Sequence, residues 1–148
     1  MPILNYTTKI STAKTAGEIQ EILVKAGAAS IRIDYEDGEA VSISFLLVIG
    51  NNQTPFRLPS YWQGVYKLIS KDPAIRWQLR TEAQAKRIAW RIVKDWAEAQ
   101  IAFLQSGQAS MTQLFLPYAV QRSGRTFYEE VAANPRLLLA ADDEENPS

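Results

Sequence analysis

The sequence predicts a mixed α+β fold in the order α-β-β-β-α-α, followed by a small C-terminal helical portion. Apolar and polar residues alternate along residues 31–58 in three short segments that turn residues separate. Apolar residues recur at helical spacing before and after this region. A three-stranded antiparallel meander is unstable alone, so we expect helices over residues 16–26 and 82–106 to pack against it.

The chain length suits one domain, since 148 residues is an ordinary domain size. We expect that domain to comprise residues 1–133. Residues 134–148 include the acidic run Asp142–Glu145 and are expected to form a flexible tail.

The first helix is expected over residues 16–26. Thr15 and Glu18 have the spacing of a capping box, in which the hydroxyl caps the helix and the carboxylate reaches back to the backbone. Apolar residues follow at helical spacing, and Gly27 is suited to the left-handed conformation that ends a helix.

The first strand and its turn come next. Ile31, Ile33 and Tyr35 alternate with charged residues, which is typical of a strand with one apolar face. Asp37 and Gly38 then form a strong signal for a tight hairpin.

The second strand, over residues 41–49, continues this alternation. Leu46 and Val48 add apolar side chains to its other face, so we expect the strand to be central and covered on both faces. Phe56 and Leu58 mark a short third strand, and its two flanking prolines favour an edge position.

The remaining elements are predicted to be helical. Ser60 is expected to cap a short helix that continues to about Lys71. Thr81 and Gln84 form a second capping box, which opens the clearest helix of the chain, over residues 82–106. Shorter helical segments are expected over residues 110–116 and 127–133.

Composition excludes several kinds of chemistry. The chain has no histidine and no cysteine, so it lacks the usual general base near neutral pH, the thiolate nucleophile and the commonest transition-metal ligands. No glycine-rich phosphate loop and no Gly-x-Ser-x-Gly motif is present. We therefore expect no cofactor, no metal and no catalytic residue.

An acidic cluster around the first hairpin leaves one enzymatic alternative. Asp34, Glu36, Asp37 and Glu39 are carboxylates of the kind that bind Mg²⁺ or act as acid and base. A nuclease-like site would need a lysine on the next strand, but residues 41–49 carry no charge. A polar outer face with turn residues is the favoured interpretation of this cluster.

We expect the protein in the cytoplasm and not in a membrane. The N-terminus has no basic segment followed by an apolar one, as a signal peptide would. The longest apolar run, Phe45–Ile49, is too short to span a bilayer.

Charge is unevenly distributed, although the formal net charge is zero. Residues 57–94 contain nine basic and two acidic residues, whereas the segments on either side are net acidic. A net positive segment of this kind is typical of a surface for an anionic partner, and nucleic acid is the leading candidate.

Within this segment, helical spacing places Arg80, Arg87, Arg91 and Lys94 within about 60° of one another on the long helix. Aromatic residues lie between the basic ones and would stack on the bases of a single strand if they were exposed. The predicted phosphate contacts are Arg76, Arg80, Lys86, Arg87, Arg91 and Lys94. The predicted stacking residues are Trp77, Trp90 and Tyr61.

Two alternatives to this interface remain open. The basic stripe also fits a solvated helix face with ion pairs four residues apart. Tryptophans at helical spacing also fit a core or a contact between protein chains.

Three segments of the sequence resemble a family of short uncharacterised proteins from bacterial, prophage and phage genomes. They are residues 31–45, 55–59 and 80–96, and the likeness extends to about Glu130. The resemblance implies a mobile-element setting, with DNA metabolism or host–phage conflict as the context. It indicates neither a particular activity nor any site residues.

The order of elements is also similar to that of the double-stranded-RNA-binding domain. The basic, alanine-rich start of the long helix resembles that family's final helix, with Lys86 and Arg87 as the corresponding cations. About twenty residues and a helix separate the third strand from this helix, where that family has a short loop.

The sequence therefore predicts a non-enzymatic accessory or binding protein that contacts nucleic acid, or a complex acting on it, through residues 57–94. The alternative is a protein–protein adaptor, an inhibitor or a small homo-oligomer without nucleic-acid binding.

Overall fold

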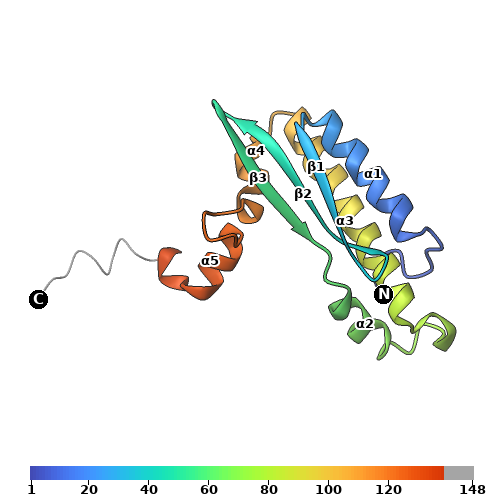
Figure 1. Cartoon of the computed structure of the whole chain (residues 1–148). Helices are drawn as coiled ribbons and strands as arrows, with labels where there is room; N and C mark the ends of the chain where they lie inside the picture. The colour runs from blue at the N-terminus through green and yellow to red at the C-terminus, as the bar shows by residue number, and fades with distance from the viewer. Residues whose placement is uncertain (139–148) are drawn as a thin grey trace, which may run out of the picture.

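The computed structural model describes residues 1–138, apart from the side chain of Pro59. It has the predicted α+β order, with α1 (Thr12–Lys25) followed by an antiparallel sheet in the order β1-β2-β3. The strands are β1 (Ser30–Glu36), β2 (Glu39–Ile49) and β3 (Asn52–Pro59). Figure 1 shows the sheet with α1 and the long helix α3 (Glu82–Gln105) behind it.

Helix α1 begins four residues earlier than predicted. Ser11, and not Thr15, is its N-cap, and the Ser11 side chain accepts a hydrogen bond from the Lys14 backbone N–H at 3.1 Å. Thr15 is fully buried inside the helix and faces α3. Gly27 follows the helix with a φ of 100°, which is the predicted left-handed stop.

The hairpin between β1 and β2 forms where it was predicted. Asp37 and Gly38 both have positive φ, at 50° and 79°, as a tight turn between antiparallel strands requires.

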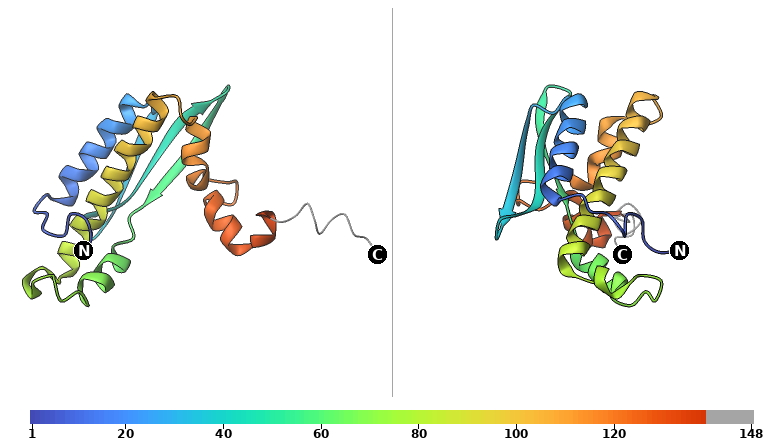
Figure 2. Two further views of the ribbon diagram at one scale, coloured as in Figure 1. Left: turned by 180° about the vertical axis from the view of Figure 1, so that it is seen from behind. Right: turned by 90° about the vertical axis from the view of Figure 1, so that its right-hand side faces the viewer.

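The central position predicted for β2 is confirmed, but the prediction that both of its faces are covered is wrong. Ile43, Phe45 and Leu47 are buried on one face, whereas Val48 on the other face is 58 % exposed. The side view in Figure 2 shows why: α1 and α3 lie on the same side of the sheet. The other face has no helical layer among residues 1–138.

The helices after the sheet follow the prediction with one correction. Helix α2 (Trp62–Ile69) starts after Tyr61, whose side chain makes no capping bond, so Ser60 is not its cap. Thr81 does cap α3, and its side chain accepts a hydrogen bond from the Gln84 backbone N–H at 3.1 Å. A 3₁₀ turn, η1 (Trp77–Leu79), precedes that cap.

The C-terminal part covers a portion of the β3 edge of the sheet. It contains α4 (Met111–Phe115), the 3₁₀ turn η2 (Leu116–Tyr118), α5 (Phe127–Ala133) and η3 (Pro135–Leu138). Ala119 bridges Phe56 of β3, and the Val120 backbone N–H donates to the Pro55 carbonyl at 2.9 Å. The predicted tail thus begins with a short helical turn, and residues 139–148 lie outside the described part of the chain.

Two hydrophobic clusters hold these elements together, and α3 contributes to both. In the larger one, the rings of Phe45 and Phe56 stack 5.5 Å apart, and Phe115 meets both edge-on. The smaller one lies between α2, the loop after it and the start of α3, and contains Ile69, Ile75, Ala85 and Ile88. No helix within residues 1–138 is long and apolar enough to cross a membrane.

Replacing Phe115 by alanine is expected to lower the free energy of unfolding by about 3–5 kcal/mol, because the fully buried ring leaves a cavity between the sheet and Trp96. Urea denaturation measures this change. Leu116→Ala is the matched control, since Leu116 is 43 % exposed and its loss is expected to cost far less. Equal losses in the two variants would contradict the role given to Phe115 in the core.

Candidate nucleic-acid interface

Two cations of the predicted stripe, Arg91 and Lys94, are engaged within the fold. The Arg91 guanidinium forms an ion pair with Glu18 of α1 and donates to the Thr15 hydroxyl at 3.3 Å. Its side chain is only 12 % exposed. Lys94 pairs with Glu98 at 2.6 Å, and its side chain is 16 % exposed. This face of α3 therefore meets α1, which helical spacing alone does not reveal.

Arg87 also serves the structure. Its Nε and Nη2 donate to the side-chain oxygen of Gln84 at 2.9 and 2.7 Å. The Gln84 side chain is buried, and its nitrogen donates to the backbone carbonyls of Tyr6 and Thr8, each at 2.9 Å. Arg87 thus orients the amide that fastens the N-terminal segment to α3.

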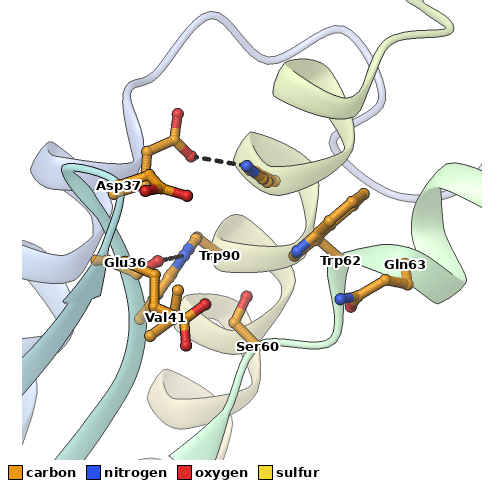
Figure 3. A pocket seen from close by; sticks show the side chains of 10 residues that line it. Glu36, Asp37, Val41, Ser60, Trp62, Gln63 and Trp90 are labelled. Carbon is orange, nitrogen blue, oxygen red and sulfur yellow. Dashed lines mark hydrogen bonds and ion pairs between the residues drawn. The ribbon is translucent and has the colours of Figure 1, made fainter.

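Lys86 lies at a pocket with an acidic rim, which Figure 3 shows. Its ammonium is 3.5 Å from a carboxylate oxygen of Glu39 and 5.0 Å from the centre of the Trp62 ring. Glu36 and Asp37 line the same pocket, which has a volume of about 360 Å³. Since these carboxylates repel a phosphate, Lys86 is poorly placed to contact one.

Trp90 forms part of the wall of this pocket, and its ring is not available for stacking. The side chain is 2 % exposed, and its indole N–H donates to the Ala40 carbonyl at 3.1 Å. In Figure 3 the ring lies between the hairpin and α3. Trp90 therefore belongs to the core that joins α3 to β2.

The carboxylates of the hairpin do not assemble into a metal site. No group of three acidic side chains within residues 1–138 is arranged to hold a metal ion. Asp34 faces away from the pocket, where it pairs with Arg32 at 3.1 Å and accepts from the Ser42 hydroxyl at 3.1 Å. The Ser60 hydroxyl is buried beside the pocket and has no hydrogen-bond partner among the described residues.

Arg80 holds the loop between α2 and α3. Its Nε donates to the Ile75 carbonyl at 3.0 Å, and its Nη2 donates to the Asp72 carbonyl at 3.1 Å. The Asp72 carboxylate in turn accepts from the Ala74 backbone N–H at 2.9 Å. Ile75 is 1 % exposed and anchors the loop in the smaller hydrophobic cluster. The hydrogen bonds from Arg80 and the burial of Ile75 therefore both hold this loop in place.

This loop carries two predicted contacts that remain accessible, Arg76 and Trp77, and a third predicted contact, Tyr61, is exposed just before α2. Trp77 is 74 % exposed, and Arg76 beside it is exposed as well. Lys67 and Lys71, on and just after α2, are also exposed. Among residues 1–138 none of these three cations forms an ion pair or a side-chain hydrogen bond.

We call residues 61–80, which comprise α2, the loop and η1, the basic lobe. Figures 1 and 2 show α2 and this loop beyond the end of the sheet, and Trp62 and Gln63 of α2 line the pocket of Figure 3 together with Glu36 and Asp37. The lobe contains four basic residues and one acidic residue. Lys67 and Lys71 belong to the predicted basic segment but were not among the predicted contacts, because helical spacing does not distinguish them. Their exposure in the structure does.

Arg57, the first cation of the basic segment, is held by the C-terminal part. Its Nη2 donates to a Glu129 carboxylate oxygen at 2.9 Å and to the Gly124 carbonyl at 3.2 Å. The pKa of Glu129 lies below its ordinary value because the Thr126 backbone N–H and hydroxyl donate to the carboxylate, and Arg57 adds to this effect.

Because the pKa of Glu129 is lower in the folded chain than its ordinary value of 4.5, the ionised carboxylate stabilises the fold at pH values above 4.5. This stabilisation is lost as the pH falls through the folded-state pKa. Glu129→Gln is therefore expected to be less stable than the wild type at pH 7, with the difference shrinking below about pH 4.5. Thermal unfolding across pH 3–7 measures both chains. Tyr128→Phe is the control, and a difference between Glu129→Gln and wild type that does not vary with pH would contradict this account.

Comparison of the chain with protein-family models, with curated proteins and with solved structures finds no match. The charge and exposure of the basic lobe, and the hydrogen bonds that hold its loop, are therefore the basis for the function proposed below.

Proposed function

We propose that this protein is a non-enzymatic accessory protein that binds single-stranded nucleic acid through the basic lobe. The observation that carries the proposal is Trp77, which a firmly anchored loop holds 74 % exposed beside the exposed Arg76. An indole held in water beside cations matches the aromatic platforms on which bases stack in single-strand binders.

The charges of the lobe support the same ligand. Lys67, Lys71 and Arg76 are exposed, so each can neutralise a phosphate and release its counterions. The acidic residue of the lobe, Asp72, is partly buried, and its carboxylate accepts a backbone hydrogen bond. The accessible side chains of the lobe therefore present net positive charge.

A single strand fits better than a duplex. Bases in a duplex are already stacked on one another, so their faces cannot cover the Trp77 ring, whereas unstacked bases can. We also propose a cytoplasmic setting associated with phages or other mobile elements, which is the setting that the sequence resemblance implies.

A protein–protein role is the second candidate, because the lobe also exposes apolar side chains. Tyr61 is 71 % exposed and Leu68 is 51 % exposed. Tryptophan and arginine are also the residue types that dominate binding energy in protein interfaces. Salt dependence separates the two functions, since only phosphate binding weakens steeply as salt rises.

Removal of the three lobe cations is expected to weaken single-strand binding and its salt dependence. In Lys67→Ala/Lys71→Ala/Arg76→Ala, the slope of log K against log salt should fall by about 2, since each phosphate contact to a single strand contributes about 0.7. Fluorescence anisotropy with a labelled 20-nucleotide DNA or RNA between 50 and 200 mM salt measures the slope. Arg122→Ala removes an exposed arginine outside the lobe and should leave it unchanged. Absence of binding by the wild type at 50 mM salt would overturn the proposal.

Trp77→Ala is expected to weaken binding about 5- to 150-fold, which corresponds to the loss of about 1–3 kcal/mol of stacking on one base. The wild type should also show quenching of tryptophan fluorescence on binding, and the variant should show much less. Tyr128→Ala is the control, because Tyr128 is 64 % exposed on α5, outside the lobe. Equal affinity of Trp77→Ala and wild type would mean that the lobe does not stack on bases.

A further inference from the structure

Strand β1 is an open edge of the sheet. It pairs with β2 on one side, and no other strand within residues 1–138 pairs with its free side. The opposite edge is different, because Ala119 and Val120 cover part of β3. An uncovered edge strand presents backbone N–H and C=O groups that can pair with another strand.

The side chains of β1 make this edge complementary to itself. If two copies of the strand pair antiparallel with Ile33 opposite Ile33 of the partner subunit, Arg32 of each copy lies opposite Asp34 of the partner subunit. Within one chain these two side chains already pair at 3.1 Å, so they lie on the same face of the strand. The two-fold arrangement places opposite charges together twice, which favours pairing.

We propose that two copies of this chain associate through β1 and the neighbouring face of α1, with the two β1 strands antiparallel and Ile33 on the two-fold axis. The sheets of the two copies then form one six-stranded sheet. This surface contains no residue of the basic lobe, so the proposal is independent of nucleic-acid binding.

Tyr35 supports this register. It is 59 % exposed at the end of β1, although an aromatic side chain in a strand usually packs against a neighbour. Ile31 on the same strand is only partly buried. In the proposed pairing Tyr35 lies opposite Ile31 of the partner subunit, so an aromatic and a β-branched side chain meet across the strands and cover each other.

The outer face of α1 provides the second contact. About a third of a turn away from its buried residues, it carries Ala13, Gly17, Gln20 and Val24, which recur at the spacing of a helix–helix contact. Val24 is 58 % exposed. These residues line a shallow hollow of about 790 Å³, and no described residue of the chain fills the space beside Gly17.

Charge flanks this hollow in a self-complementary way. Lys14 and Glu21 lie on the same side of α1, seven residues apart. An antiparallel pair of α1 helices brings Lys14 near Glu21 of the partner subunit and Glu21 near Lys14 of the partner subunit. The strand and the helix are thus both complementary to themselves in the antiparallel sense, as one two-fold axis requires.

The mass of the protein in solution tests the association. Sedimentation equilibrium at about 10–200 µM should give a mass near twice the 16.6 kDa of the chain. Arg32→Asp makes the edge acidic, and Asp34→Arg makes it basic, so each alone should dissociate at least about 10-fold more readily. An equimolar mixture of the two variants should recover the dimer as a heterodimer. A wild type that is monomeric at 200 µM would overturn the proposal.

Gly17 tests the helix contact separately. A Cβ atom at Gly17 meets no other atom within 4 Å, so Gly17→Arg should fold normally, as circular dichroism would show, yet block the approach of the second helix. Gly17→Ala is the matched control and should keep the dimer. Arg122→Asp reverses a charge away from β1 and should also keep it. A dimer that persists in both Arg32→Asp and Gly17→Arg would place the interface elsewhere and refute this one.

Discussion

The apolar face of the three-stranded sheet must be buried, and the rest of the structure depends on how α1 and α3 bury it. Both helices lie on the same side, so α1 meets α3 as well as the sheet. The first turns of α3 also extend past the ends of the strands. Those turns need a second cover, which α2 and the loop after it supply through Ile69 and Ile75.

This arrangement decides what the charged residues of α3 do. Arg91 faces α1 and pairs with Glu18, whereas Lys94 pairs with Glu98 of the same helix, and both cations are nearly buried. A buried cation without such a partner would be costly, which makes these pairs a condition of the packing. Most of the positive charge of residues 57–94 is thus engaged within the fold, and within that segment of the described chain the fully exposed cations all belong to the basic lobe.

The two proposed binding surfaces lie where the packing leaves side chains or backbone groups of the described chain exposed. The cover over the start of α3 is a small lobe whose inner side is apolar and whose outer side is free to carry Lys67, Lys71 and Trp77. The C-terminal segment covers part of β3, but nothing in the described chain pairs with the free side of β1. The basic lobe has net positive charge and an exposed indole ring, which favour a polyanion as its partner. The β1 edge has opposite charges that pair across a two-fold axis, which favours a second copy of the chain.

Local sequence signals determined the elements: the alternation along β1 and β2, the Asp37-Gly38 turn, and the Thr81 cap of α3 are all where the sequence predicts them. These features depend on neighbours within four or five residues, so the sequence reveals them directly. The start of α1 was misplaced because Ser11 and Thr15 are both good caps, and only the burial of Thr15 against α3 selects Ser11. Exposure depends on segments far apart in the chain. Only the tertiary structure decided that Trp90 is buried and Trp77 exposed, because the hairpin covers one ring and no described residue covers the other.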